Sequence, residues 1–551
     1  MTTQGIGDLP SGLPPGPQTA PGGPVAVSVP DAVRIATELF ESGKHADAEN
    51  VCLQILGVDP ENADALHICG ALAHLAGRHG IALPLLEKAA RLQPGNGQIQ
   101  YNLGVVFGAL RMREQAIKCY RAALALQPGH GNALQNLGNL FLENDEFIEA
   151  QRCYEAMLPR APRNAVLYLS LALLFNAQRQ IGRARWFFER ALALDPDNVR
   201  IQWEAAMLYL LLGDFERGWA YYEARFPAGD ACKVWQYPFP FPRWQGEPLA
   251  GKHLLVHGEQ GLGDEMMFLS IVPELLEEGA RVTLVGQPHL HELWRDALPQ
   301  CRAFVQMRVN EDAWTRIEPE WINELGPVDY QIPFGSLALL RRRTLTDFAR
   351  QKPYIKANAA KSADWAAWLD TRLAPRGQRL RIGLVWAGNP APHNVVANRK
   401  DAKRSLALSE FYRLGDTPGV DWVSLQTWQA ADQVRQAPAH FPLLDCSERL
   451  TDFSQTAALI DNLDMVISVD TSVCHLSGAM GKPVWILLPY MGEWRWGLDP
   501  ERSHWWPTAR LFRQASMGDW HGVVDRVGAA LRAQLGLPEA QASGTPAEVV
   551  A

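Results

Sequence analysis

Residues 97–130 read GQIQYNLGVVFGALRMREQAIKCYRAALALQPGH, and a related block of 34 residues follows directly at 131–164. Prolines recur along the first half of the chain at the same interval of 34 positions, at Pro60, Pro94, Pro128, Pro162 and Pro196. A fixed period of this length indicates a repeat architecture, in which each repeat is one small structural unit. Aligned on this period, the chain has six frames, at 29–62, 63–96, 97–130, 131–164, 165–198 and 199–232.

Two positions of every frame hold only small residues, which indicates two helices that approach each other closely. The first column is Ala36, Gly70, Gly104, Gly138, Ala172 and Ala206, and the second is Ala48, Ala82, Ala116, Ala150, Ala184 and Gly218. The proline then ends the second helix of each frame. These columns resemble the tetratricopeptide repeat. The resemblance implies a solenoid of six helix pairs over 31–226, whose concave surface holds an extended segment of a partner.

Two asparagines are candidates for that partner groove. Asn102 and Asn136 each precede a Leu-Gly pair in the first helix of their repeats. They resemble the asparagine ladder of O-linked N-acetylglucosamine transferases. The alternative is a solvated polar face, because Arg34, Ile68 and Ser170 interrupt the ladder.

Composition limits the remaining possibilities. The chain has 551 residues, 47% of them hydrophobic, and a net charge of −8, which argues against a nucleic-acid partner. No apolar run is long enough to span a membrane, and the N-terminus lacks the basic-then-apolar pattern of a signal peptide, so we expect a cytoplasmic protein without a transmembrane segment. The 8 cysteines form no C-x-x-C pair and are expected to be reduced thiols.

Both ends of the chain are expected to be unstructured. Residues 1–30 contain 7 prolines, 6 glycines and a single charged residue, which predicts a disordered leader. Residues 537–551 are similarly small and polar, and we expect a flexible tail there. Between the repeats and the second half, residues 227–250 are rich in proline and aromatic residues and predict a packed linker.

The second half alternates strand-length apolar runs with helical stretches, which is typical of a parallel α/β sheet. A first group of strands is expected at 253–257, 281–285, 303–307 and 329–332, with helices near 264–278 and 288–298. A second group is expected at 381–386, 422–425, 465–469 and 484–488. Two Rossmann-like halves are therefore predicted, at 251–375 and 376–536, with a cleft between them.

A glycine-rich turn follows the first of these strands and reads GEQGLGD from Gly258 to Asp264. The backbone at Gly261 and Gly263 can approach a ligand closely, as such turns do in nucleotide-binding folds. The glycine spacing and the lack of an acidic residue after the second strand argue against an NAD site. For Asp264 two roles stay open: the cap of the following helix, or a carboxylate that acts as a general base.

An anion-binding motif is predicted where the strand 465–469 passes into a helix. There Asp470, Thr471, Ser472 and His475 bring backbone N–H groups, hydroxyls and an imidazole together, as a phosphate requires. The alternative is an ordinary helix cap with a core histidine. The position at the carboxyl edge of the sheet favours the ligand site.

A basic loop is predicted after the strand 381–386. Four cations lie within 399–404, and Arg404 and Ser405 end the loop, which can clamp a diphosphate. A charge run of this kind is otherwise a solvated face. The tryptophans near the C-terminus can stack on a ligand, although most tryptophans belong to the core. The single Asp-x-Asp, at 195–197, falls in a repeat turn, so no metal site is predicted.

These motifs together resemble the heptosyltransferase-related glycosyltransferases of family 9, which have the GT-B fold, over roughly residues 250–535. The resemblance implies that Asp264 deprotonates the acceptor hydroxyl, on the 251–375 side of the cleft. It implies that Asp470, Thr471, Ser472 and His475 bind the donor diphosphate in 376–536, that Arg404 neutralises the leaving group, and that Gln426 grips the nucleotide. Inversion at the anomeric carbon then needs no metal or other cofactor. A solenoid joined to a GT-B unit is also the layout of O-linked N-acetylglucosamine transferases.

Two functions are compatible with these motifs. The first is a metal-independent inverting glycosyltransferase that takes a nucleotide-sugar and an acceptor, protein or glycan, recruited by the repeats. The second is a binding scaffold with a degenerate nucleotide-binding unit. The sequence leaves open the donor sugar, the nature of the acceptor and the oligomeric state.

Overall fold

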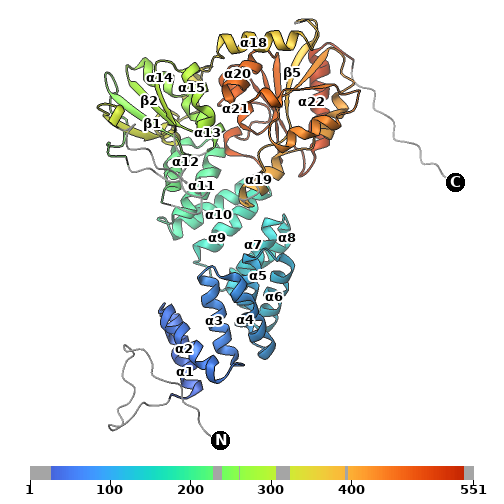
Figure 1. Ribbon diagram of the computed structural model, residues 1–551. Coiled ribbons are helices and arrows are strands. Elements are labelled where there is room, and N and C mark those ends of the chain that lie inside the picture. Colours follow the sequence, from blue (N-terminus) through green and yellow to red (C-terminus); the bar gives the residue numbers. More distant parts are fainter. Residues whose placement is uncertain are drawn as a thin grey trace, which may run out of the picture. The chain divides into compact units, whose positions relative to one another are not determined.

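The computed structural model describes residues 27–227, 239–259, 261–305, 323–375, 377–390 and 395–538. Nearly all of the expected leader and tail lies outside these residues. The chain divides into two compact units, Met1–Asp195 and Pro196–Ala551 (Figure 1). Within the described residues, no helix has the length and apolar character that a membrane crossing needs.

The first unit consists of five helix pairs. They are α1 Val29–Glu41 with α2 His45–Val58, α3 Ala63–Leu75 with α4 His79–Leu92, α5 Gly97–Ala109 with α6 Arg113–Leu126, α7 Gly131–Glu143 with α8 Phe147–Met157, and α9 Ala165–Ala177 with α10 Ile181–Leu194. A polar side chain caps each first helix, for example Asn62 on the N–H of Ala65 and Asn164 on the N–H of Leu167. The expected helix pairs are confirmed.

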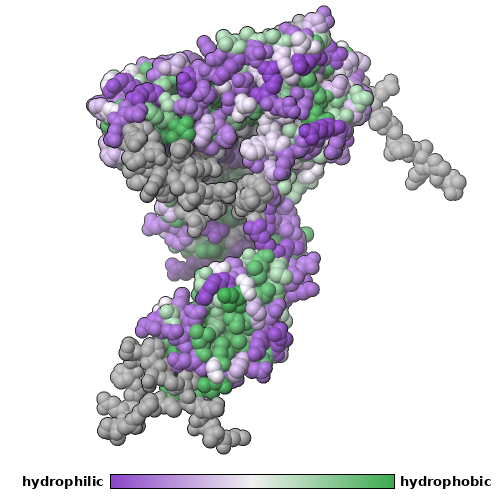
Figure 2. Space-filling model, in the orientation of Figure 1, coloured by the Kyte–Doolittle hydropathy of each residue, from purple (hydrophilic) through white to green (hydrophobic). Residues whose placement is uncertain are grey.

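The small-residue columns have a direct packing reason. A Cβ added to Gly104 would lie 2.7 Å from the ring of Tyr120, and one added to Gly138 would lie 2.5 Å from the ring of Tyr154. Glycine at these positions lets the second helix of each pair place an aromatic ring against the backbone of the first. On the visible face of this unit, hydrophobic residues gather among the polar ones (Figure 2).

The sixth helix pair belongs to the second unit. It comprises α11 Val199–Leu211 and α12 Phe215–Tyr222, and a short 3₁₀ turn, η1 Glu223–Arg225, follows. Trp219 packs edge-on against Phe268 of the first α/β half and against Trp494 and Trp505 of the second. Its indole N–H donates to the carbonyl of Arg342 at 2.7 Å. The last repeat is therefore part of the core that it shares with both halves.

The first α/β half is built on a four-stranded parallel sheet. Its strands are β1 His253–His257, β2 Arg281–Gly286, β3 Arg302–Val305 and β4 Tyr330–Pro333, in the order β3-β2-β1-β4. The single helix expected near 264–278 is two helices, α13 Leu262–Leu269 and α14 Val272–Glu277. The other helix, expected at 288–298, is a 3₁₀ turn, Pro288–Leu290, and α15 His291–Ala297.

The second α/β half has a six-stranded parallel sheet in the order β10-β9-β8-β5-β6-β7. Its strands are β5 Leu380–Val385, β6 Val420–Ser424, β7 Leu443–Asp445, β8 Met465–Val469, β9 Val484–Leu488 and β10 Ala509–Arg513. This is the order of a doubly wound dinucleotide-binding sheet. Helices α18 Ala359–Asp370, α19 Val395–Arg404, α20 Phe453–Asp461, α21 Ser472–Ala479 and α22 Trp520–Gln534 accompany it, together with 3₁₀ segments that include η6 Leu408–Leu414, η7 Gln429–Gln436 and η9 Trp494–Trp496.

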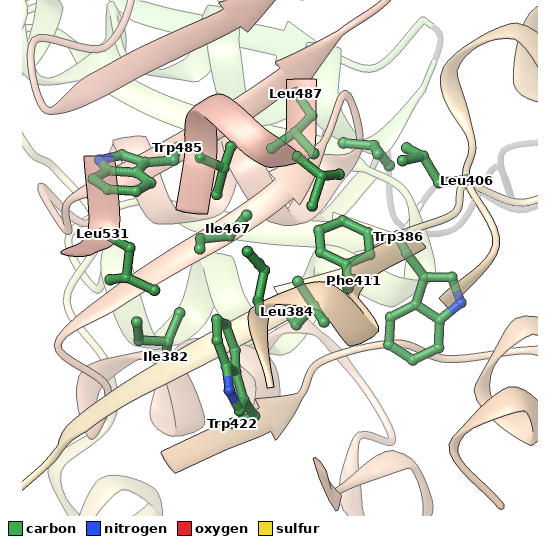
Figure 3. Close-up of a cluster of buried hydrophobic side chains, with 14 of the residues drawn as sticks. Ile382, Leu384, Trp386, Leu406, Phe411, Trp422, Ile467, Trp485, Leu487 and Leu531 are labelled. Atoms are coloured by element: carbon green, nitrogen blue, oxygen red, sulfur yellow. The ribbon is translucent and has the colours of Figure 1, made fainter. Parts of the chain in front are cut away.

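The core of this half lies on the face of the sheet that α22 and η6 cover. Ile382 and Leu384 from β5, Trp422 from β6 and Ile467 from β8 meet there, all at most 2% exposed (Figure 3). Apolar residues on both faces of the central strands explain why these strands have little alternation in sequence.

Part of the expected linker, 228–238, lies outside the described residues. The rest packs on the first α/β half. Trp244 is buried, and Phe239 lies with its ring centroid 4.7 Å from that of His257. The segment also adds a short parallel bridge between Arg243 and Gln331 at the edge strand β4.

Candidate active site

The two sheets each reverse their strand order once, and ligands of doubly wound folds bind at the carboxyl ends of the strands on either side of such a reversal. In the second half the reversal lies between β5 and β8. The loop that starts at Gly388 follows β5, and Asp470, Thr471 and Ser472 follow β8. The predicted diphosphate loop and anion motif therefore lie together at this position.

Asp264 lies on the first turn of α13 and forms an ion pair with the other half. Nε and Nη2 of Arg495 approach its Oδ1 at 2.7 and 2.6 Å. The two side chains are only 15% and 17% exposed. Burial raises the pKa of Asp264, and the Arg495 charge opposes this rise. The cap of α13 is Gly261, without a side-chain hydrogen bond, so the structure gives Asp264 no capping role.

The glycine-rich turn touches the anion motif directly. A Cβ added to Gly263 would lie 2.8 Å from Cδ2 of His475 and 3.5 Å from the Cα of Ser472. Gly261 has more room, since its nearest such contact is Asp264 Oδ2 at 3.7 Å. Only a glycine at 263 lets the N-terminal turns of α13 and α21 approach this closely.

His475 is a neutral hydrogen-bonding residue. The indole N–H of Trp506 donates to its Nδ1 at 3.1 Å, and Trp496 stacks on the imidazole with a centroid distance of 5.0 Å. Burial and the Arg495 charge lower the pKa of His475 to about 3. Because Nδ1 accepts a hydrogen bond, the proton of the neutral ring is on Nε2, on the side of Gly263. His475 can donate to an anion but does not carry a positive charge.

The start of α21 is open to an anion. Thr471 is the N-cap residue by position, yet its side chain makes no capping bond, and its hydroxyl lies 3.1 Å from that of Ser468. The N–H groups of the first turn thus face the carboxyl edge of the sheet without a side-chain acceptor. This differs from the alternative of an ordinary side-chain cap.

One group of possible metal ligands occurs among the described residues. Ligand atoms of Asp470, Cys474 and His475 lie within 4.8 Å of one another. However, the Cys474 thiol donates to the carbonyl of Thr471 at 2.8 Å, and burial raises its pKa well above the usual range. His475 Nδ1 is already bonded to Trp506. A protonated thiol and an engaged imidazole fit a metal ion poorly.

The basic segment predicted as a loop is instead the C-terminal part of helix α19, and a buried aspartate, Asp401, organises it. Asp401 accepts from Arg404 Nε at 3.1 Å and from the hydroxyl of Ser405 at 3.1 Å. Ser405 in turn accepts from the N–H of Gly388 at 3.0 Å. Arg404 stays 35% exposed, so its charge is positioned at the ligand edge while Ser405 shapes the loop.

Gln426 acts on the backbone of the same edge. Its Oε1 accepts from the N–H groups of Trp386 and Ala387 at 3.1 and 3.0 Å, and its Nε2 donates to the carbonyl of Ala387 at 3.0 Å. The side chain is 3% exposed. Gln426 therefore fixes the shape of the turn after β5.

In the first half, the strand order reverses between β1 and β4. The segment that ends the sixth repeat contacts the loops that follow these two strands. Arg225 binds Glu259 through two bonds, Nε to Oε2 at 2.6 Å and Nη2 to Oε1 at 2.8 Å, and Gly335 N–H donates to the same Oε1 at 2.8 Å. Arg225 is fully buried and Glu259 is 6% exposed. Tyr222, Glu259 and Asp264 line a small cavity here. The glycine-rich turn is thus anchored to the segment that ends the sixth repeat, within the second unit.

A second carboxyl lies next to Asp264. Glu265 is 1% exposed, accepts from the N–H of Gln287 at 3.3 Å, and has no partner for its Oε1 among the described residues. Burial raises the pKa of Glu265 to about 8. At pH 7 this side chain is therefore mostly neutral and cannot share the role of Asp264 as a base.

The partner-groove candidates lie on the first helices of their repeats and link neighbouring repeats. Asn102 Nδ2 lies 2.6 Å from Nε2 of His67 in the preceding repeat. Asn136 donates to the hydroxyls of Tyr101 and Tyr120, both at 3.4 Å. They form an inter-repeat network, and their role in partner binding stays a prediction.

Sequence reasoning missed several residues of this site. Arg495 lies between Trp494 and Trp496 in the sequence, and no function is predicted for it from this pattern. Arg225, Glu259 and Asp401 also had none. The late tryptophans are largely core, and they form the wall behind His475 and Arg495.

Family profiles of two kinds match the chain. Tetratricopeptide-repeat profiles match residues 33–97 and 97–130. A profile described as glycosyltransferase family 9 (heptosyltransferase) matches residues 447–491, which include Asp470–His475.

One curated relative is Protein FlbA of Caulobacter vibrioides (strain ATCC 19089 / CIP 103742 / CB 15), 27% identical over 342 residues. The match covers 60% of this chain and 55% of that protein, so the chain spans about half the length of this relative. Similar solved structures include a tetratricopeptide repeat protein from Parabacteroides merdae ATCC 43184, which is 19% identical in sequence. The match covers 37% of this chain and 83% of that chain, with a TM-score of 0.33. Another is PilF of Pseudomonas aeruginosa, at 18% identity, 37% and 95% coverage and a TM-score of 0.33. The repeat profiles and the observed helix pairs identify the N-terminal part of the chain as a helical tetratricopeptide solenoid, and the α/β region that follows carries the family 9 match.

Proposed function

We propose that the second unit is a metal-independent, inverting glycosyltransferase of the GT-B type, and that the repeats recruit its protein or glycan acceptor. The observation that carries the proposal is the contact between two helix starts. α13 brings Asp264 to the place where α21 presents its N-terminal turn, and Gly263 makes this approach possible. The family 9 match supports transferase activity.

The proposed reaction separates charge across the site. Asp264 accepts the proton of the acceptor hydroxyl as the oxygen attacks the anomeric carbon from the side opposite the leaving group. The N–H groups of the first turn of α21, the Nε2–H of His475 and the charge of Arg404 stabilise the departing nucleotide phosphate. The residues of the second half thus take the charge that a metal ion takes in other transferases.

Arg495 sets a condition for this reaction. In the present ion pair both of its contacts fall on Asp264 Oδ1, which weakens the carboxylate as a base. Glu493 also binds Arg495, so the guanidinium keeps one anionic partner if it leaves Asp264. A bound donor phosphate offers a second partner, and the exchange would free Asp264 for the acceptor.

The test is a screen of nucleotides and nucleotide-sugars by thermal shift, followed by release of nucleotide in the presence of a cell-lysate acceptor. A bound ligand raises the unfolding temperature in proportion to ln(1 + [L]/Kd). We expect one nucleotide class to bind and its sugar derivative to be consumed with excess chelator present. Loss of activity with chelator would contradict the metal-independent mechanism. Binding without any consumption of donor would favour the scaffold function.

A further inference from the structure

Trp428 differs from the other tryptophans of its sheet. It follows β6 by four residues, and its side chain is 65% exposed, whereas Trp386 after β5 and Trp422 within β6 are almost completely buried. Single exposed apolar residues are common on protein surfaces, so the exposure alone carries no functional meaning.

The backbone of Trp428 provides an independent observation. Its φ is 61° and its ψ is −162°, in a region that essentially only glycine occupies. The same region is adopted in this chain by Gly497, with φ 55° and ψ −158°. Glycine would fit position 428 without strain, so the backbone conformation gives no reason for a tryptophan there. Strained residues of this kind cluster at ligand sites.

The conformation is held by the turn around it. The N–H of Ala431 donates to the carbonyl of Trp428 at 3.0 Å. Gln426 donates to the carbonyl of Thr427 at 3.2 Å while it binds both backbone groups of Ala387. Trp428 is therefore fixed to the same turn that carries the phosphate-directed loop of Gly388.

The sheet topology indicates which part of a ligand reaches this place. β5 and β6 are the first and second strands of a doubly wound sheet, whose dinucleotide ligands place phosphate at the end of the first strand and the nucleoside at the end of the second. The loop of Gly388 and the adjacent Arg404 occupy the phosphate position, and the first turn of α21 follows the neighbouring strand β8. Trp428 occupies the nucleoside position.

We infer that Trp428 is the stacking platform for the nucleobase of the nucleotide that binds this edge. The inference rests on the proposed function, because it names one contact of the same ligand. Every nucleobase has a π face that can lie on an indole, so this contact adds affinity with little selectivity between bases. Selectivity between donors then has to come from other residues.

The experiment compares the parent with Trp428→Gly and Trp428→Phe by calorimetry, using UDP, GDP, ADP and inorganic pyrophosphate as probes. Trp428→Gly is expected to weaken the best-bound nucleoside diphosphate by about 5- to 150-fold, which corresponds to one lost stacking contact. Trp428→Phe is expected to stay within a few-fold of the parent. Pyrophosphate has no base, so its affinity should not change.

Folding is controlled within the same experiment. Because glycine relieves the strained backbone, Trp428→Gly is expected to unfold at or above the temperature of the parent. Unchanged nucleoside diphosphate affinity in Trp428→Gly would overturn the inference and leave the proposed function intact. An equal loss of pyrophosphate affinity would also overturn it, since Trp428 would then act on the phosphate loop. If the parent binds none of these nucleotides, the inference falls together with the proposed function.

Discussion

The buried ion pair between Arg225 and Glu259 gives the sharpest prediction about how the last repeat supports the catalytic unit. Arg225→Ala removes both bonds to Glu259 and leaves that carboxylate 6% exposed, with the N–H of Gly335 as its remaining hydrogen-bond donor among the described residues. Removing one member of a buried pair costs about 3–5 kcal/mol, because the remaining charge stays desolvated. We expect the free energy of unfolding of the second unit to fall by that amount.

Tryptophan fluorescence during urea unfolding measures this unit selectively. Only Trp186 of the 19 tryptophans precedes residue 196, so 18 of them report on the second unit. The fluorescence midpoint should shift to lower urea at an unchanged slope. The matched control is Arg343→Ala, because Arg343 pairs with Glu216 at 58% and 72% exposure and such a pair contributes about 0–1 kcal/mol.

A double variant separates the pair from the loss of packing. Arg225→Met with Glu259→Gln removes both charges and keeps most of the volume, so it should recover part of the stability that Arg225→Ala loses. If Arg225→Ala stays within about 1 kcal/mol of the parent, the sixth repeat does not anchor the glycine-rich turn through this pair and the reasoning is refuted.

Three further predictions concern the packing, the pH dependence and the division of the chain. Gly263→Ala should lower the free energy of unfolding in urea by about 1–3 kcal/mol and weaken nucleotide binding, because the added Cβ meets the ring of His475. The control Gly261→Ala should change stability little, and equal effects of the two variants would contradict the close approach of the two helices. The pKa of Glu265 is raised to about 8, so the folded state holds more protons than the unfolded state between about pH 4.5 and 8, and stability is lost as the pH rises through this window. Glu265→Gln should remove that loss when unfolding curves at pH 5 and pH 9 are compared. The same loss in parent and variant would refute the role of Glu265. A chain lacking residues 1–195 should keep its nucleotide affinity but lose recognition of the natural acceptor, while a chain lacking residues 1–226 should fail to fold. Transfer at the parental rate by the chain lacking 1–195 would show that the first five repeats have no part in recruitment.

The sequence predicted the elements whose signal is local. The strands 465–469 and 484–488 have their expected bounds, because both are continuous apolar runs buried on two faces. Ala509–Arg513 was missed, since its arginines break the apolar run, and Leu443–Asp445 is too short for a periodic pattern.

The same distinction applies to the site. Asp264 and Asp470 could be located because each follows a buried strand within a glycine or hydroxyl motif. Arg495 reaches Asp264 from 231 positions away, and no local pattern encodes such a pair. The neutrality of His475 was also not predictable, because it depends on burial and on Trp506, which is 31 residues away.

The assignment of Asp264 as the general base is tested most directly with Asp264→Asn. Both the rate of sugar transfer and the nucleotide affinity of this variant are measured. The amide keeps the size and the hydrogen-bond acceptor of the carboxylate but cannot take the proton of the acceptor hydroxyl. The proposed mechanism predicts a loss of about 10²–10⁴-fold in rate with nucleotide affinity at least that of the parent, because Arg495 then has no carboxylate at position 264 to leave. Glu265→Gln is the neighbouring control and should keep the parental rate at pH 7, because Glu265 is mostly neutral there. Full turnover by Asp264→Asn would contradict the assignment of the base, and with it the proposed mechanism.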